Sequence, residues 1–152
     1  MKDGLSQSFV YSIAEDEEGF IWIATQDGLN RFDGESFKDY KSSHNDPHSI
    51  ANNFIRKVFV DADNTLWVGT GDGLSKYNRE LEKFENYYNQ IDQANTLADN
   101  EIWDIYQDKN DVVWVSTATA IHKYNKEDNT FNKVRIRGFE TEVKEVKKLF
   151  QD

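Results

Sequence analysis

Residues 16–25 read Asp-Glu-Glu-Gly-Phe-Ile-Trp-Ile-Ala-Thr, and the same pattern returns at residues 61–70 and again at residues 108–117. In each copy an aspartate stands six residues before a tryptophan, and a threonine stands three residues after it. The tryptophan has an aliphatic residue on each side, and a small residue follows. The residues that define the repeat are Asp16, Trp22, Thr25, Asp61, Trp67, Thr70, Asp108, Trp114 and Thr117. The sequence therefore consists of three similar units, and this repeat determines the architecture.

Each unit is predicted to form four short antiparallel strands. An apolar pair stands six and three residues before each aspartate: Val10, Ile13, Ile55, Val58, Ile102 and Ile105. A three-residue step does not fit the two-residue period of a plain strand, so we expect a β-bulge or a local twist in the first strand of each unit. The turn that begins at the aspartate ends in Gly19, Asn64 or Asp111, residue types that tolerate a positive φ. A tight hairpin into the tryptophan strand should follow.

The tryptophan strands should be followed by a second turn. Asp27-Gly28 and Asp72-Gly73 form this turn in the first two units, but the third unit has Thr119-Ala120-Ile121 where Asp-Gly-Leu is expected. The third turn is therefore predicted to be irregular. Long connections, residues 41–53 and 88–100, separate the units. We interpret Ile50 and Leu97 as apolar plugs that anchor these connections.

Four-stranded units of about 40–50 residues with one tryptophan each are typical of β-propeller blades. A single blade cannot bury both of its faces, so the tryptophan and its aliphatic neighbours should form the core between stacked blades. We therefore predict an all-β fold. It is a partial β-propeller of three four-stranded antiparallel blades of about 45–47 residues, plus the first strand of a fourth. The expected blades span about residues 8–41, 53–88 and 100–135.

Residues 139–152 are predicted to begin the fourth blade. Val146 and Leu149 fall on the two apolar positions of the first strand, but together with Val143 and Phe150 they also fit one face of a helix. Both conformations stay open. Complete propellers have about 4–8 blades, so we expect a fragment of a longer protein whose open blade faces favour self-association.

The composition excludes several classes of function. Lys plus Arg is 18 and Asp plus Glu is 28, so the net charge is −10 and nucleic acid is not expected as a partner. The chain contains no cysteine, which excludes disulfides and thiol catalysis. No apolar stretch is long enough to span a bilayer, so no membrane contact is expected within this chain. Aromatic residues make up 14% of the chain, which is enough to build a core.

One position varies in type among the units and is the candidate ligand site. Trp103 is the one tryptophan outside the repeat, and its counterparts are Tyr11 and Arg56. If the first strand of each blade is innermost, these three side chains point toward the central channel or its rim. There they could stack on a sugar or another small ligand. The alternative is that they pack between the blades.

The other candidates for chemistry have simpler explanations. His44 and His48 flank Asp46 in a connection, but no third ligand is evident, so no metal site is predicted. His122 aligns with Asn30 and Ser75 and is predicted to be a surface residue. The aspartates of the repeat recur in every unit, which favours a role in turns over catalysis. No catalytic residue and no cofactor are predicted.

The sequence resembles a known family of repeats. Residues 4–7, 10–16 and 19–34, and more closely residues 66–78, are similar to the two-component regulator propeller repeat with its Trp-x-x-Thr-x-x-Gly-Leu core. The resemblance implies the periplasmic or extracytoplasmic sensor region of a bacterial inner-membrane protein, often a hybrid histidine kinase. It implies that the segment itself is non-catalytic and senses oligosaccharides. Two alternatives remain: a fragment of a propeller enzyme of the glycosidase or lyase type, and a pure protein-interaction scaffold.

Overall fold

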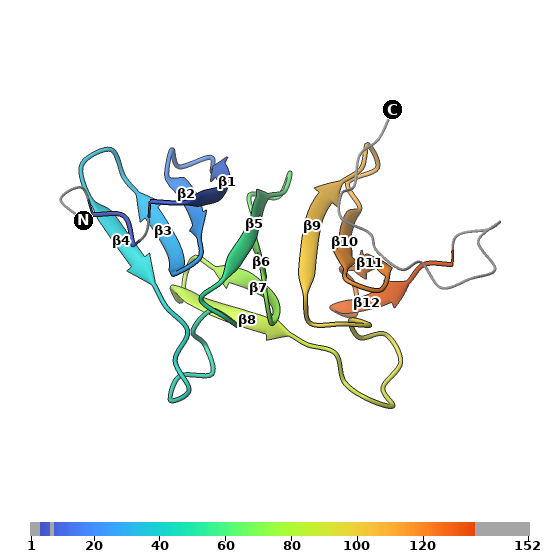
Figure 1. The fold of residues 1–152 in the computed structure, drawn as a ribbon. Coiled ribbons are helices and arrows are strands. Elements are labelled where there is room, and N and C mark those ends of the chain that lie inside the picture. The colour runs from blue at the N-terminus through green and yellow to red at the C-terminus, as the bar shows by residue number, and fades with distance from the viewer. Residues whose placement is uncertain (1–3, 7, 136–152) are drawn as a thin grey trace.

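The computed structural model describes residues 4–6 and 8–135, which form three four-stranded antiparallel sheets and contain no helix (Figure 1). The strands of the first blade are β1 (Val10–Glu15), β2 (Ile21–Thr25), β3 (Gly28–Phe32) and β4 (Phe37–Tyr40). Those of the second blade are β5 (Ile55–Val60), β6 (Leu66–Thr70), β7 (Gly73–Asn78) and β8 (Lys83–Tyr87). Those of the third blade are β9 (Ile102–Gln107), β10 (Val113–Thr117), β11 (Ile121–Asn125) and β12 (Thr130–Lys133).

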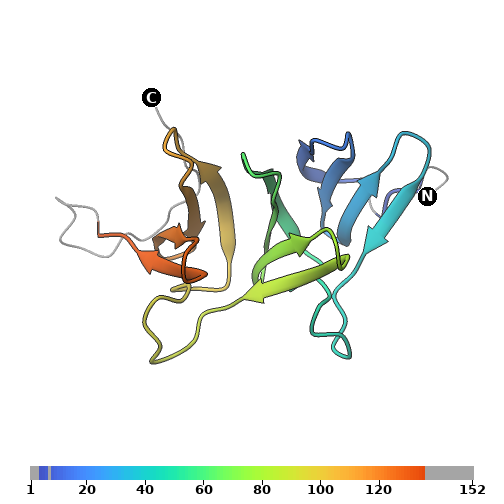
Figure 2. The same cartoon turned by 180° about the vertical axis from the view of Figure 1, so that it is seen from behind.

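The sheets are arranged as consecutive propeller blades. Each strand pairs with the next one in sequence, and the contacts between blades run mainly from β1 to β5 and from β5 to β9. The two connections between blades project from the same side of the array (Figures 1 and 2). The predicted all-β, partial-propeller fold is therefore confirmed. Residues 139–152, predicted to begin a fourth blade, lie outside the described residues.

A β-bulge interrupts the first strand of every blade, as predicted. In the first blade the pairing with β2 steps from Val10 directly to Ser12, which leaves Tyr11 without a cross-strand partner. The extra residue is Arg56 in the second blade and Trp103 in the third. The bulge compensates the three-residue step, so that both members of the apolar pair reach the same face of the blade.

The core lies between the blades, also as predicted. Trp22 and Trp67 are 0% and 1% exposed, and each lies against the next blade. The first cluster joins blades one and two and contains Trp22, Ala24, Leu29, Ile50, Ile55, Val58, Leu66, Val68, Tyr77 and Phe84. The second joins blades two and three and contains Trp67, Leu74, Leu97, Ile102, Ile105, Val113, Val115, Tyr124 and Phe131. Every blade thus presents two apolar faces of different composition.

The repeated aspartate organises the first turn of each blade. Its Oδ2 accepts a hydrogen bond from the indole Nε1 of the tryptophan six residues on, at 2.6 Å for Asp16 and 2.8 Å for Asp61 and Asp108. Its Oδ1 accepts hydrogen bonds from the amides two and four residues ahead. The carboxylate therefore joins the turn to the interblade tryptophan, and the predicted turn role is confirmed.

The positions predicted to need a positive φ have one. Gly19, Asn64 and Asp111 close the first turn with φ of 83°, 59° and 61°. The threonine that follows the tryptophan closes the second turn, because Thr25 Oγ1 donates to the Gly28 carbonyl at 2.8 Å and Thr70 does the same to Gly73 at 2.7 Å. The repeat threonines are fully buried.

The connections between blades also cover exposed edges. Ile50 and Leu97 are each 1% exposed, which confirms that they are apolar plugs. The outermost strands β8 and β12 receive a partner from these connections. The Phe84 amide donates to the His48 carbonyl at 2.8 Å, and the Phe131 amide donates to the Asn95 carbonyl at 2.9 Å. Such cover reduces the tendency of an edge strand to pair with another chain.

The prediction that His122 lies on the surface is wrong. His122 is 0% exposed, as are Asn30 and Ser75 at the same position of the other blades. His122 Nε2 accepts a hydrogen bond from the Ala98 amide at 2.9 Å, and the equivalent side chains accept one from Ser6 or Ala51. The position is polar in all three blades because its side chain accepts a hydrogen bond from the segment that precedes the blade.

Candidate functional site

The bulge residues lie in one continuous row across the three inner strands. The Arg56 guanidinium lies over the Trp103 ring, with its carbon 4.2 Å from the ring centroid, and over the Phe54 ring at 4.8 Å. Tyr11 meets Phe54 edge to face, with centroids 5.4 Å apart. The structure therefore brings Arg56 and Trp103 into direct contact and links Tyr11 to them through Phe54. We call this row the bulge ladder.

Sequence reasoning missed the second half of the bulge ladder. Phe9, Phe54 and Glu101 stand two residues before the bulge residues, at one equivalent position of the three blades. Phe9 and Tyr11 are tilted rings with centroids 5.0 Å apart, and Glu101 forms an ion pair with Arg56. The two-residue strand period could have identified these residues, because it places side chains two apart on one face.

The bulge ladder is partly open to solvent. Phe9 is 61% exposed and Tyr11 is 39% exposed, whereas Phe54, Arg56 and Trp103 are half-buried. Gln26 Nε2 donates to the Tyr11 hydroxyl at 2.5 Å, so an amide side chain holds the Tyr11 ring in place. The ladder lies where β1, β5 and β9 begin, at the end that receives the connections between blades.

Arg56 is the electrostatic centre of the bulge ladder. Its guanidinium is held between two aromatic rings. A planar cation suits this place because it can stack on the ring faces. One of its Nη atoms donates to the Glu101 carboxylate, which neutralises the charge locally. Its Nε is buried and has no hydrogen-bond partner among the described residues. The ladder therefore combines aromatic faces with one internally compensated ion pair.

This arrangement is suited to binding rather than to bond cleavage. Aromatic rings offer flat apolar faces, and Arg56, Glu101 and Gln26 add groups that donate and accept hydrogen bonds at the edges. A ligand with an apolar ring face and polar groups at its rim would match both the aromatic rings and the polar side chains of the bulge ladder. The carboxylates of the repeat lie elsewhere and are engaged in the turns.

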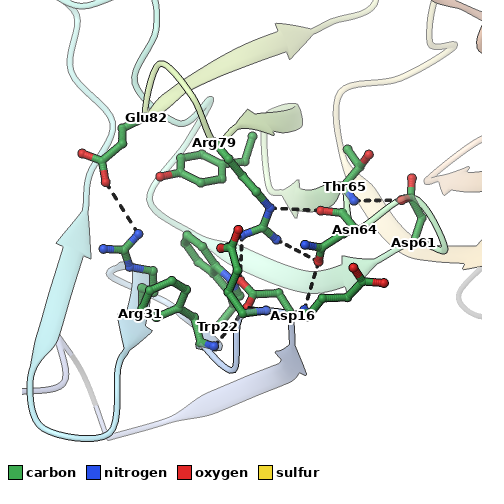
Figure 3. Close-up of polar contacts among 12 residues, drawn as sticks. Asp16, Trp22, Arg31, Asp61, Asn64, Thr65, Arg79 and Glu82 are labelled. Atoms are coloured by element: carbon green, nitrogen blue, oxygen red, sulfur yellow. Dashed lines mark hydrogen bonds and ion pairs between the residues drawn. The ribbon is translucent and has the colours of Figure 1, made fainter.

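A second polar cluster joins the first two blades on the side of the β1–β2 turns (Figure 3). Arg79 Nη1 lies 2.8 Å from Asp16 Oδ2 and 2.9 Å from Glu18 Oε2, and its Nε donates to the Asn64 carbonyl at 3.1 Å. Asn64 Oδ1 also accepts from the Glu17 amide at 3.1 Å. All groups in this cluster are engaged with one another, so we assign it a structural role.

The same cluster sets the ionisation of Asp16. Burial alone would raise the pKa of Asp16, but the hydrogen bonds from Trp22, Arg79 and the Phe20 amide together hold it below the usual value of 3.8. The pKa of Asp108 is likewise lowered, chiefly by the hydrogen bond from Trp114. Both carboxylates stay ionised at neutral pH, as a turn-forming acceptor requires.

No metal centre is assembled by the described residues. Within residues 4–6 and 8–135, no group of three or more His, Cys, Asp or Glu side chains is placed to hold a metal ion. His44 and Asp46 line a polar hollow of about 510 Å³ between the first connection and Asp72. Among the described residues no helix is long and apolar enough to cross a bilayer.

A comparison with known protein families also finds three copies of one repeat in this chain. The family described as two component regulator propeller matches residues 4–27, 49–72 and 96–119. Each matched range begins one residue before an apolar plug position and ends in the turn after the tryptophan strand. The matched ranges begin 45 and 47 residues apart, which are also the spacings of the tryptophans Trp22, Trp67 and Trp114.

Two individual relatives carry names from two-component signalling. Histidine kinase P4 of Formosa agariphila is 51% identical over 49 residues, which is 32% of this chain and 4% of that protein. The extracellular domain of BT3049 from B. thetaiotaomicron, described as a hybrid two component system, matches with a TM-score of 0.80 and 30% identity. That match covers 86% of this chain and 19% of the other.

A more distant structure shows the fold alone. The extracellular domain of BT4673 from B. thetaiotaomicron, described as a one component system, matches with a TM-score of 0.51 and 20% identity over 91% of this chain and 23% of the other. In each comparison the match spans a quarter or less of the relative. The two component regulator propeller family thus matches one segment in each of the three blades of this chain.

Proposed function

We propose that this chain is a non-catalytic, extracytoplasmic sensor segment of a two-component signalling protein, and that the bulge ladder binds a small carbohydrate. Support for the sensor role comes from the extracellular domain of a hybrid two component system that matches over 86% of this chain. The relative named as a histidine kinase adds to that support. A signalling output would lie in another part of the parent protein.

The observation that carries the ligand proposal is the bulge in each inner strand. A bulge residue has no cross-strand partner, and bulges commonly re-aim a side chain toward a site. Here the three bulge positions hold tyrosine, arginine and tryptophan, and all three lie in one row. A sugar ring could stack on Tyr11 or Trp103 while its hydroxyls meet Arg56 and Glu101.

The non-catalytic assignment is supported by what the acidic side chains do. The three repeat aspartates make the same three types of hydrogen bond in every blade. Each is therefore occupied by its own turn and tryptophan. Glu101, the carboxylate of the bulge ladder, is paired with Arg56.

The test is a titration of the chain with a panel of oligosaccharides, followed by calorimetry. Trp103→Ala and Tyr11→Ala should each weaken binding about tenfold or more, because each removes a stacking surface. Far-ultraviolet circular dichroism should show that both variants keep the fold.

The matched control is Tyr88→Ala. Tyr88 is 37% exposed and Tyr11 is 39% exposed, but Tyr88 lies outside the bulge ladder. Its removal should leave the affinity unchanged. If the unsubstituted chain binds oligosaccharides and the Tyr11→Ala and Trp103→Ala variants bind them equally tightly, the bulge ladder is not the ligand site.

A further inference from the structure

Every cation on the three inner strands is paired with a carboxylate of the neighbouring blade. The cationic side chains of β1, β5 and β9 are Arg56 and Lys57, which follow one another on β5. Arg56 forms an ion pair with Glu101, and Lys57 Nζ lies 2.8 Å from Asp104 Oδ1. Both carboxylates belong to the third blade, so both pairs lie at a junction between two described blades. These three strands therefore offer a ligand no uncompensated positive charge.

The ion pair of Arg56 occupies the place that an aromatic contact takes at the other junction. Phe54 and Glu101 stand at equivalent positions, and so do Tyr11 and Arg56. Phe54 of the second blade lies against the Tyr11 ring of the first, with centroids 5.4 Å apart. Glu101 of the third blade meets Arg56 of the second in the same relation. The bulge ladder therefore has an uncharged aromatic half and a half in which one positive and one negative charge are balanced.

Glu101 is the more exposed member of its ion pair. The Arg56 side chain is 20% exposed and the Glu101 side chain is 36% exposed. Arg56 Nε is buried, and the guanidinium is held between the rings of Phe54 and Trp103. A ligand that approaches from solvent therefore meets more of the carboxylate than of the cation.

This arrangement discriminates against anionic ligands. A carboxylate on a sugar would lie beside Glu101, and like charges in such a contact repel one another. It could approach Arg56 closely only by displacing Glu101, which would leave a half-buried carboxylate without its cation. The hydroxyl groups of an uncharged sugar can donate to Glu101 and accept from Arg56 while the ion pair stays intact. The net charge of −10 adds a repulsion at longer range.

We propose that the bulge ladder selects uncharged oligosaccharides over those that contain uronic acids, and that Glu101 determines this specificity. The inference rests on the proposed function, because it names the class of carbohydrate that the same site takes. Glu101 contributes to specificity through the ligands that it repels. Without its charge, Arg56 would be free to bind a carboxylate through two parallel hydrogen bonds.

The experiment compares matched ligands by calorimetry on the full chain. Cellotriose, mannotriose and galactotriose are each compared with the trisaccharide of the same linkages whose hydroxymethyl groups are replaced by carboxylates. The unsubstituted chain should bind the uncharged member of a pair about tenfold or more tightly than the acidic member. Equal binding of both members, or tighter binding of the acidic one, would overturn this inference and leave the proposed function standing. If none of these trisaccharides binds, the carbohydrate proposal fails and this inference fails with it.

Glu101→Gln tests the role of Glu101 directly. The amide keeps the size of the side chain without its charge, so the variant should bind the acidic trisaccharide about tenfold or more tightly than the unsubstituted chain does. Added sodium chloride should weaken this new binding, because it depends on a charge that solvent reaches.

The matched control is Glu15→Gln. It removes the same charge from an exposed residue at the other end of β1, away from the bulge ladder, and should leave the preference for uncharged sugars unchanged. If Glu101→Gln is folded by circular dichroism and keeps that preference too, Glu101 does not determine the specificity. The preference of the unsubstituted chain is measured without any substitution, so the selection against acidic sugars stays testable even if Glu101→Gln does not fold.

Discussion

At the scale of single residues, one position shows how three side chains perform one structural task. Asn30, Ser75 and His122 are each fully buried, and each accepts a hydrogen bond from the chain segment that precedes its blade. Asparagine and serine do so without a titratable group. Histidine does so only in its neutral form, because a protonated ring has no acceptor.

His122 should make the third blade sensitive to acid. Burial lowers the pKa of His122 from 6.5 to about 4, a shift that the Val115 carbonyl partly opposes. The unfolded chain takes up a proton near its ordinary pKa while the folded chain does not. The free energy of unfolding should therefore fall by up to about 3 kcal/mol as the pH drops from about 6.5 to about 4.

Urea unfolding at pH 7 and pH 4.5 measures this effect. His122→Ser, which installs the residue of the second blade, should remove most of the loss in stability between these two pH values. His48→Ser, at an exposed histidine in the first connection, should retain it. Asp16 and Asp108 have lowered pKa values, so their contribution is lost only below their ordinary pKa of 3.8. An unchanged pH dependence in His122→Ser would contradict this assignment.

At the scale of elements, the second turn of each blade explains why glycine is required in two blades and absent from the third. Gly28 and Gly73 have φ of 116° and 115°, and their amides donate to the Asn53 and Asn100 carbonyls of the next connection. In the third blade the equivalent amide, that of Ala120, donates instead to Thr117 Oγ1 at 3.2 Å, so that turn closes on itself. The predicted irregular turn is confirmed: β11 begins one residue later than β3 and β7 do.

Gly73→Ala should therefore destabilise the chain. The new Cβ would lie 2.6 Å from Tyr88 Cε1 and 3.0 Å from Ala51 Cβ, at a φ that alanine adopts only with strain. We expect a loss of about 1–3 kcal/mol in the free energy of unfolding. Gly71→Ala is the control, because Gly71 lacks a positive φ and its added Cβ would lie 3.2 Å from the Phe54 ring. Urea denaturation that gives equal losses for both would count against the backbone argument.

At the scale of the whole molecule, neighbouring blades are joined by side chains as well as by their cores. Arg79 of the second blade reaches back to Asp16 and Glu18 of the first. Lys126, at the equivalent position of the third blade, reaches back to Asp63 of the second at 2.6 Å. The two bridges differ in environment. The Asp16 side chain is 0% exposed, whereas the Lys126 and Asp63 side chains are 74% and 57% exposed.

This difference predicts unequal coupling between the blades. Arg79→Met should cost about 1–3 kcal/mol, because a buried carboxylate loses its cation but keeps Trp22 and two amides as donors. Lys126→Met should cost about 0–1 kcal/mol, since exposed ion pairs contribute little. Hydrogen exchange should show lost protection in β2 and β3 of Arg79→Met while β10 and β11 keep theirs. Equal loss in all three blades would mean that the chain unfolds as one unit.

Much of the fold could be predicted because the repeat shows each position three times. The strands, bulges, turn aspartates and interblade tryptophans recur, so their roles follow from periodicity. His122 was wrongly placed because its partner, Ala98, belongs to a connection whose path is set by tertiary packing. Arg79 was missed for a related reason: its carboxylate partners Asp16 and Glu18 belong to the neighbouring blade, and no pattern within one repeat unit reveals them.

The bulge has a consequence for how such a protein diversifies. A residue in a regular strand is constrained by its partner across the sheet, because a substitution there changes both the strand pairing and the side-chain packing. The strand register passes over Tyr11, Arg56 and Trp103, and their differences in size and charge leave that register intact. Each blade therefore contributes one position at which the residue type can change without shifting the strand register. A propeller built this way can acquire new recognition properties one blade at a time.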